Sequence, residues 1–222
     1  WAGWVIPLIF TAPLFTQDIY SYLANGSIVA QGMDPYSAGP VQLLGAGNKL
    51  ARSVPFIWAN SPSPYGPVAL GLAAVVSAVT SNSILLGVIT HRLLSIAGII
   101  VAGWAISCLA QRCRVSPESA LWLGILNPLT ILHLVGGIHN ESIMLGLLLV
   151  GMELGLRGVD KLDASRRSAY LALVASGFCL SCAGMVKVTG FIGLGFVGMA
   201  YARRLINAHG TARWKALAYA IA

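Results

Sequence analysis

The chain has 222 residues, of which 57% are hydrophobic and 9% are charged, and its mean hydropathy is +0.78. Soluble domains carry about 25% charged residues, so this composition excludes an ordinary soluble protein and predicts an integral membrane protein. The net charge of +7 does not indicate nucleic-acid binding, because most basic residues stand in short segments beside apolar runs, as the positive-inside rule expects. The chain begins with Trp1 inside an apolar run, and we interpret it as part of a longer membrane protein, cut at both ends.

The first predicted element is the end of a membrane span, over residues 1–15. A long loop follows over residues 16–64 and opens with a polar, aromatic stretch. At 100° per residue, this stretch separates into two faces, which predicts an amphipathic helix of about four turns lying at the membrane surface. Its polar face comprises Gln17, Asp18, Ser21, Tyr22 and Asn25, and its apolar face comprises Ile19, Leu23, Gly26 and Ala30. Thr16 is the predicted N-cap, and Gly32 is expected to end the helix.

Residues 65–222 are predicted to form membrane helices. Residues 68–79 are apolar but short for a crossing, which needs about 20 residues. Five further apolar runs are predicted as spans: Ile84–Ala110, Glu118–Val135 with a kink at Asn127-Pro128, Ser142–Leu156, Tyr170–Val186 and Thr189–Tyr201. Another span is expected to start at Trp214.

Basic residues predict the orientation of these spans. Three basic segments, over residues 111–114, 157–167 and 203–215, are expected in the cytoplasm. If residues 68–79 cross the membrane, Asp18 is cytoplasmic. If they are re-entrant or interfacial, Asp18 faces the opposite side, and we prefer this alternative because the segment is short and no positive charge follows it.

In the preferred orientation, polar residues from distant segments gather on one non-cytoplasmic face. They are Asp18, Asp34, Tyr65, His139, Asn140, Glu141 and Lys187. His91 and Arg92, about two turns into their span, are candidates for the same cavity, because charged residues inside a membrane are costly and usually functional. The alternatives are that His91 and Arg92 reach the interface, that Lys187 is an interfacial anchor and that residues 139–141 form a hydrated turn.

Several motifs resemble a known family. The segment Asp18-Ile19-Tyr20-Ser21-Tyr22, followed by Gly32-Met33-Asp34-Pro35-Tyr36, resembles the first outer loop of GT-C glycosyltransferases that use polyprenyl-phosphate sugars. Four further motifs make the resemblance more specific within this class of enzymes. They are Ser63-Pro64-Tyr65-Gly66-Pro67, Asn127-Pro128, Gly136-Gly137-Ile138-His139-Asn140-Glu141 and Met185-Val186-Lys187-Val188-Thr189. Together they are similar to the actinobacterial polyprenol-phosphomannose-dependent alpha-1,6-mannosyltransferases that build the lipomannan backbone. The resemblance covers roughly residues 10–190.

This resemblance implies an all-α, polytopic, GT-C-like helix bundle in the plasma membrane, with a long first outer loop that carries an amphipathic helix. The implied reaction transfers mannose, with inversion, from polyprenyl phosphomannose to an alpha-1,6-mannan or lipoglycan acceptor on the extracytoplasmic face. Asp18 is the implied general base, and Asp34 is the fallback. No cofactor, metal or nucleic acid is expected.

The remaining candidates are assigned by the same resemblance and by their chemistry. Substrate-binding candidates are Tyr20, Tyr22, Asn25, Tyr36, Tyr65, His139, Asn140 and Glu141. Candidates to meet the charge on the leaving phosphate are His91, Arg92 and Lys187.

Two other classes of function stay open. A multi-span transporter would use the ionisable residues as a solute or proton path, but it should place them at mid-membrane and show internal repeats, and the sequence shows no repeat. A non-enzymatic scaffold would not need an acidic, aromatic loop. An enzyme of this kind requires Asp18, Tyr65, His139 and Lys187 around one cavity.

Overall fold

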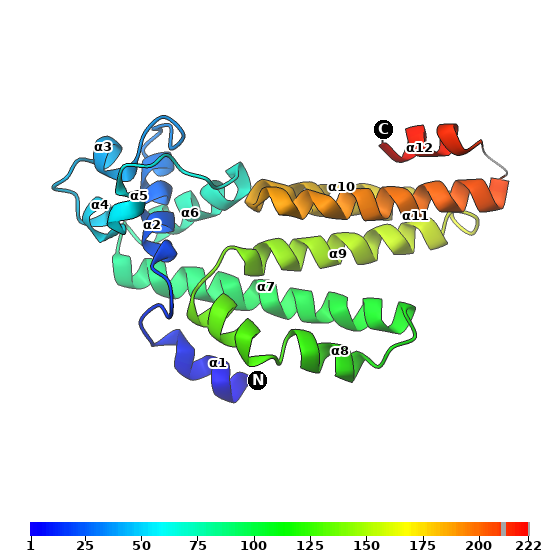
Figure 1. Ribbon diagram of the computed structural model, residues 1–222, viewed down its shortest axis with the longest axis horizontal. Helices are drawn as coiled ribbons and strands as arrows, with labels where there is room; N and C mark the ends of the chain where they lie inside the picture. Colours follow the sequence, from blue (N-terminus) through cyan, green and yellow to red (C-terminus); the bar gives the residue numbers. More distant parts are fainter. Residues whose placement is uncertain (210–211, 222) are drawn as a thin grey trace.

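The computed structural model describes residues 1–209 and 212–221, and each element of regular structure in this part is a helix. Figure 1 shows four long helices side by side along the longest axis: α7 (Ile84–Arg112), α9 (Glu141–Asp160), α10 (Arg166–Val186) and α11 (Ile192–His209). Within the described residues, α7, α9 and α10 are long and apolar enough to cross a membrane. The prediction of an all-α polytopic membrane protein is therefore confirmed.

The predicted spans that begin at residues 84, 142 and 170 correspond to α7, α9 and α10, with small changes at their ends. The run that begins at Thr189 starts as a short 3-10 turn, η2 (Val188–Phe191), and continues as α11. The last described helix, α12 (Arg213–Ile221), packs against α11.

The segment predicted as a kinked span over residues 118–135 is not one continuous helix, and it is interrupted where the kink was predicted. The segment is broken into α8 (Pro117–Gly124) and a π-helix, η1 (Thr130–Gly136). The break lies at Asn127-Pro128, where proline has no N–H to continue the helical ladder. The Asn127 side chain replaces part of that ladder, because its Nδ2 donates to the carbonyl of Leu123 at 3.3 Å and its Oδ1 accepts from the N–H of Leu129 at 2.8 Å.

The predicted outer loop is itself helical and lies at one end of the long helices (Figure 1). After α1 (Ala2–Ile9), the chain forms α2 (Asp18–Ala30), α3 (Pro40–Leu44), α4 (Lys49–Ser53) and α5 (Phe56–Ala59). The bounds of α2 agree with the predicted amphipathic helix. The N-cap of α2 is Gln17 and not the predicted Thr16, whose hydroxyl accepts from the N–H of Asp18 at 3.2 Å. Gly32, just past the helix, has a φ of 73°.

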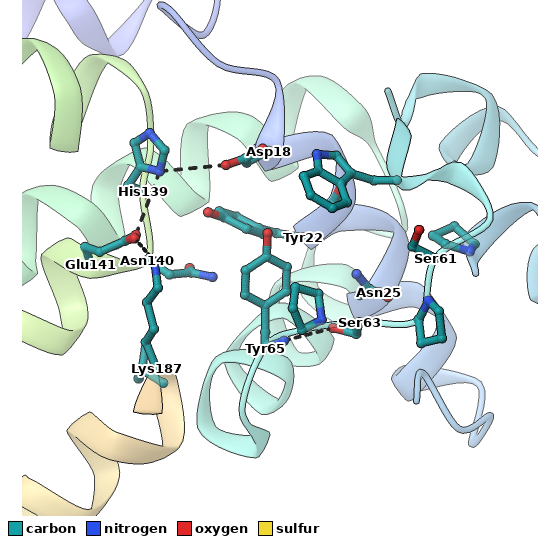
Figure 2. Close-up of a pocket in the computed structure, with 16 residues that line it drawn as sticks. Asp18, Tyr22, Asn25, Ser61, Ser63, Tyr65, His139, Asn140, Glu141 and Lys187 are labelled. Atoms are coloured by element: carbon teal, nitrogen blue, oxygen red, sulfur yellow. Dashed lines mark hydrogen bonds and ion pairs between the residues drawn. The ribbon is translucent and has the colours of Figure 1, made fainter. Parts of the chain in front are cut away.

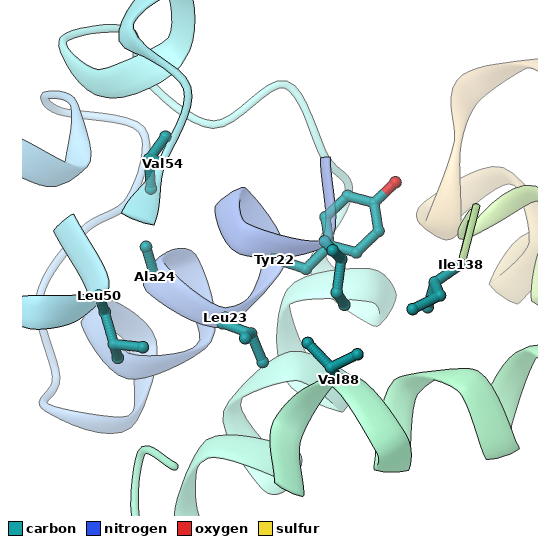
Figure 3. Close-up of a cluster of buried hydrophobic side chains, with 8 residues drawn as sticks. Tyr22, Leu23, Ala24, Leu50, Val54, Val88 and Ile138 are labelled. Carbon is teal, nitrogen blue, oxygen red and sulfur yellow. The ribbon is translucent and has the colours of Figure 1, made fainter. Parts of the chain in front are cut away.

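Both faces of α2 are buried, so the helix is enclosed by its neighbours, and its predicted place at the membrane surface stays a prediction. Its apolar side chains, including Ile19 and Leu23, join a core cluster with Val88 of α7 and Ile138 (Figure 3). On the same side of α2, α6 (Pro67–Val79) packs so closely that a Cβ at Gly26 would lie 2.3 Å from the carbonyl oxygen of Ala73. On the polar side, Ser21 and Asn25 are 5% and 3% exposed. The outer loop therefore forms a packed cap on the bundle, with α2 at its centre.

The 13 residues of α6 span about 20 Å at 1.5 Å per residue, which is less than the roughly 30 Å of a bilayer core. The helix lies beside α2 at the same end of the bundle (Figure 1). That it does not fully cross the membrane stays a prediction.

The opposite end of the bundle holds the C-termini of α7 and α9 and the start of α10 (Figure 1). Two of the predicted basic segments, 111–114 and 157–167, therefore lie far from α2. The third, 203–215, includes residues 210 and 211, which lie outside the described residues. At this end Glu153, which is 2% exposed, pairs with Arg112 at 2.6 Å and with Arg157 at 2.5 Å, and so joins α7 to α9.

Candidate functional site

A cavity of about 290 Å³ lies where the helical cap meets the bundle (Figure 2). Small-molecule sites typically measure about 300–1,000 Å³, so this cavity is of the size for one small group. It is lined by Asp18, Ser21, Tyr22, Asn25, Pro40, Trp58, Ser61, Pro62, Ser63, Pro64, Tyr65, His139, Asn140, Glu141, Val186 and Lys187. The predicted meeting of Asp18, Tyr65, His139 and Lys187 around one cavity is therefore observed.

Asp18 stands in the first turn of α2, at the positive end of the helix dipole. Its Oδ2 lies 4.0 Å from Nδ1 of His139, and the same nitrogen lies 3.8 Å from Oε2 of Glu141. Both distances are too long for hydrogen bonds. The carboxylate is one third exposed, at 33%, so it is available to a ligand in the cavity.

His139 follows η1 and stacks on His133, with ring centroids 4.2 Å apart. Burial lowers the pKa of His139, the neighbouring His133 lowers it further, and Glu141 and Asp18 oppose the shift. The imidazole is therefore neutral at pH 7, and its contact with Asp18 is not an ion pair at that pH. A neutral neighbour leaves the Asp18 carboxylate without a cation to compete for its lone pairs.

Lys187 and Glu141 form an ion pair across the cavity. Glu141 begins α9, and Lys187 directly follows α10 in an extended conformation with a φ of −148°. Half of the Lys187 side chain is exposed, so the ammonium group has room for a second anionic partner. The pair holds together the ends of two membrane helices that meet at the cavity.

Two tyrosines, Tyr22 of α2 and Tyr65 just before α6, line the same cavity as these charged residues. The rings of Tyr22 and Tyr65 meet edge to face, with centroids 4.9 Å apart and an interplanar angle of 87°. Burial raises the pKa of both phenols, and the charge of Asp18 raises the pKa of each further. Both hydroxyls are therefore protonated at neutral pH and can donate hydrogen bonds to a ligand oxygen.

Three buried polar atoms of cavity-lining residues have no hydrogen-bond partner among the described residues. They are Ser21 Oγ, Asn25 Oδ1 and His139 Nε2. Buried polar atoms are nearly always hydrogen-bonded, so each such atom requires an explanation. A ligand rich in hydroxyl groups would supply both donors and acceptors to these atoms.

The predicted place of Arg92 in this cavity is wrong. The residue is fully buried, and its guanidinium donates to the carbonyl oxygens of Ile9 (2.9 Å), Thr11 (2.7 Å), Val135 (3.3 Å) and Gly136 (3.3 Å). These carbonyls lie at the C-terminal ends of α1 and η1, where the helical ladder leaves acceptors free. Arg92 therefore joins two helix ends.

His91 does not line the cavity either. Its Nδ1 lies 3.0 Å from the carbonyl oxygen of Gly87, one turn earlier in α7, and the residue is 4% exposed. A histidine so placed is satisfied within its own helix.

Asp34, Tyr36 and Tyr20 also lie away from the cavity lining, contrary to prediction. Asp34 Oδ1 accepts from the N–H of Tyr36 at 2.9 Å, which forms an Asx-turn that stabilises the Asp34-Pro35 bend. The Tyr36 hydroxyl donates to the carbonyl oxygen of Tyr65 at 2.9 Å, and Tyr20 packs against the core cluster around α2. Tyr36 thus holds the segment that carries Tyr65.

Trp58 lines the cavity but was not among the predicted site residues. It stands in α5, a four-residue helix in which Phe56, Ile57 and Trp58 are all exposed. A tryptophan next to the proline-rich polar run over residues 60–67 is the available signal in the sequence. Ser21, Pro40, Ser61 and Ser63 were likewise missed, because small residues carry no distinctive pattern.

The sequence matches, over residues 1–203, the family described as "Alpha-(1->6)-mannopyranosyltransferase, N-terminal domain". It is 65% identical over 202 residues to alpha-(1->6)-mannopyranosyltransferase B of Corynebacterium glutamicum, which covers 90% of this chain and 34% of that protein. It is 47% identical over 165 residues to an alpha-(1->6)-mannopyranosyltransferase of Mycobacterium tuberculosis, which covers 74% of this chain and 28% of that protein.

The chain thus spans about a third of the length of the curated relatives it matches. No solved structure matches it. The match to the family extends over the cap, the cavity and the long helices, from α1 into α11. This chain belongs to the alpha-(1->6)-mannopyranosyltransferase family and corresponds to its N-terminal domain.

Proposed function

We propose that the protein is a membrane mannosyltransferase that transfers mannose from polyprenyl phosphomannose to a growing alpha-1,6-mannan acceptor. Membership of the family supports mannosyl transfer. The single observation that carries the chemical proposal is the cavity that is lined both by Asp18 of the cap and by Lys187 of the bundle. A base and a cation around one small space are what a displacement at a sugar phosphate requires.

In the proposed reaction, a hydroxyl oxygen of the acceptor attacks the anomeric carbon of the donor mannose. The new C–O bond forms as the bond between that carbon and the phosphate oxygen breaks, and the phosphate leaves with the electron pair. Asp18 takes the proton of the attacking hydroxyl. One displacement inverts the anomeric centre, so a beta-linked donor gives an alpha-linked product.

The other residues of the cavity bind and orient the substrates. Lys187 meets the charge that develops on the leaving phosphate, for which its half-exposed ammonium has room. Tyr22 and Tyr65 donate hydrogen bonds to oxygens of the donor. The unpartnered atoms of Ser21, Asn25 and His139 bind sugar hydroxyls.

We place this cavity on the extracytoplasmic face of the plasma membrane. Two of the three basic segments lie at the opposite end of the bundle, and basic segments favour the cytoplasm. The cavity is also at one end of the helices, where a donor anchored in the bilayer by its prenyl chain presents its phosphate. A transporter path would instead need its ionisable residues near the middle of the membrane.

The proposal is tested with membranes that contain the full-length protein. They are given mannose-labelled polyprenyl phosphomannose and a short alpha-1,6-mannoside, and the product is followed by chromatography. We expect label in a longer alpha-1,6-mannoside, and no such product from membranes that lack the protein. No transfer from the lipid donor, with transfer from a nucleotide sugar, would contradict the proposed donor. No transfer from either donor, with uptake of labelled solute, would favour the transporter.

A further inference from the structure

A second cavity, of about 430 Å³, lies on the other side of Asp18. It is lined by Pro13, Phe15, Thr16, Gln17, Asp18, Pro55, Ile57 and Trp58. Asp18 and Trp58 line both cavities, so they form the wall between them. A general base in a two-substrate displacement has to contact the acceptor hydroxyl while the donor carbon is close by. The position of Asp18 between two spaces meets this requirement.

The two cavities differ in charge. The first contains Asp18, Glu141 and Lys187, whereas Asp18 is the only charged side chain among the described residues that line the second. The second cavity therefore offers no cation to a phosphate. Its remaining lining consists of aromatic, aliphatic, proline and neutral polar groups, which suits an uncharged ligand.

The backbone at Phe15 is strained and turns the chain at the edge of the second cavity. The N–H of Thr16 donates to the carbonyl of Leu14 at 2.8 Å, across Phe15, which has a φ of 65°. This hydrogen bond and positive φ mark the rare, strained form of the γ-turn. A second hydrogen bond fixes this turn against η1, because the N–H of Leu14 donates to the carbonyl of Gly136 at 3.0 Å. The Phe15 ring remains 79% exposed, although burial would stabilise it.

Trp58 supplies a second aromatic ring to the same cavity. It is held on the short helix α5, which follows Pro55, and it is 44% exposed. The C–H faces of a pyranose ring are apolar and slightly positive, so they stack on the negative face of an aromatic ring. The amide of Gln17, which is also exposed, is available to sugar hydroxyls at the edge of this space.

We infer that the second cavity binds the acceptor, a neutral mannoside, with Trp58 and Phe15 as the stacking surfaces. The inference rests on the proposed function. The acceptor enters from the side of Phe15, its reacting hydroxyl contacts Asp18, and the donor mannose occupies the first cavity. Trp58 separates the two sugars and positions the acceptor. The segment 13–17 and α5, which the proposed reaction does not otherwise use, are thereby assigned to acceptor binding.

The test uses the full-length protein in detergent or nanodiscs and measures two quantities. Binding of a short alpha-1,6-mannoside alone is followed by saturation-transfer NMR, and transfer kinetics are measured with each substrate varied in turn. For Trp58→Ala we expect the KM for the acceptor and the Kd for the mannoside to rise about tenfold, as expected for a lost aromatic contact, and the KM for the lipid donor to rise less, although Trp58 also lines the first cavity. Trp58→Phe should recover most of the loss, and Phe15→Ala should behave like Trp58→Ala.

Phe56→Ala is the matched control, because Phe56 precedes Ile57 in α5, is 87% exposed and lines neither cavity. It should leave acceptor KM and mannoside binding unchanged. Equal acceptor constants for Trp58→Ala and Phe56→Ala would overturn the inference. Equal loss of membrane association in both variants would overturn it in favour of an interfacial anchor.

If the wild type binds the mannoside through Trp58 but transfers no mannose, the proposed function fails while the binding site stands. If the wild type binds no mannoside, the binding site fails, whether or not transfer occurs.

Discussion

Asp18 and His139 meet across the cavity with 4.0 Å between Oδ2 and Nδ1, one at the start of α2 and the other after η1. The contact joins the helical cap to the membrane bundle. Because His139 is neutral at pH 7, it leaves the negative charge of Asp18 unpaired at the pH where a base is needed. The protonation state of one residue therefore controls the chemistry of the other.

The lowered pKa of His139 makes the stability of the folded protein depend on pH. The unfolded chain, with an ordinary histidine pKa of about 6.5, binds a proton at a higher pH than the folded chain does. The stabilisation from the neutral form is therefore present above about pH 6.5 and is lost as pH falls towards the folded pKa. We expect the unfolding temperature in detergent to fall as pH drops below about 6.5, and His139→Gln to remove part of this fall. An identical pH profile in the variant would contradict the assignment.

The same protonation should lower activity on the acid side. A cationic His139 would pair with Asp18 and Glu141 and so weaken the proton affinity of the Asp18 carboxylate. We expect kcat/KM to decline as pH falls below about 6.5. His139→Gln should move the decline to lower pH, and an acid limb unchanged by this substitution would assign the decline to another group.

The ion pair between Lys187 and Glu141 provides a test of the phosphate-binding role. Lys187→Gln should reduce kcat by about 100-fold, which is typical for removing one group that stabilises charge in a transition state. The double variant Glu141→Lys/Lys187→Glu re-forms an ion pair but moves the cation to residue 141, the first residue of α9. We expect it to restore the unfolding temperature without restoring transfer. Recovery of transfer in the double variant would show that the pair is only structural.

Arg92 should matter for folding instead of donor binding. Arg92→Ala leaves four carbonyls without their donor, those of Val135 and Gly136 in buried positions, and each hydrogen bond to a charged group contributes about 1.5–3 kcal/mol. We expect a marked fall in unfolding temperature and in the yield of folded protein. Arg52→Ala, at an exposed position of α4, is the control and should leave both unchanged. An Arg92→Ala protein of normal stability with a raised KM for the donor would restore Arg92 to the site.

Much of the helical architecture follows from the sequence, because apolar runs of membrane length are unambiguous, as in α7 and α10. The position of α2 does not follow. Its periodicity describes two faces, but not that α6 approaches the apolar face through Gly26, nor that the polar side chains of Ser21 and Asn25 are buried as well. The broken segment around Pro128 was recognised as a weak point, but its conversion to a π-helix depends on contacts that form only in the fold.

Part of the candidate site can also be predicted from the sequence, and part of it cannot. Asp18, His139, Glu141 and Lys187 are ionisable residues near span ends, so their type and place in the chain predict a shared face. Arg92 was misassigned because a cation inside a span indicates function only when no internal acceptors meet it, and the free carbonyls at Ile9 and Gly136 cannot be seen in a sequence. Trp58 was missed because exposure and two adjoining cavities are properties of the folded chain.

The role of Asp18 as the base is tested most directly by mannosyl transfer in membranes by the Asp18→Asn variant of the full-length protein. Asparagine keeps the size of the side chain and removes the base, and general-base catalysis contributes about 10²- to 10⁴-fold. Asp34→Asn is the matched control, because Asp34 lies in the same cap but forms an Asx-turn away from the cavity. We expect Asp18→Asn to lose transfer with normal protein level and membrane insertion, and Asp34→Asn to retain it. Wild-type transfer by Asp18→Asn would show that Asp18 is not the base.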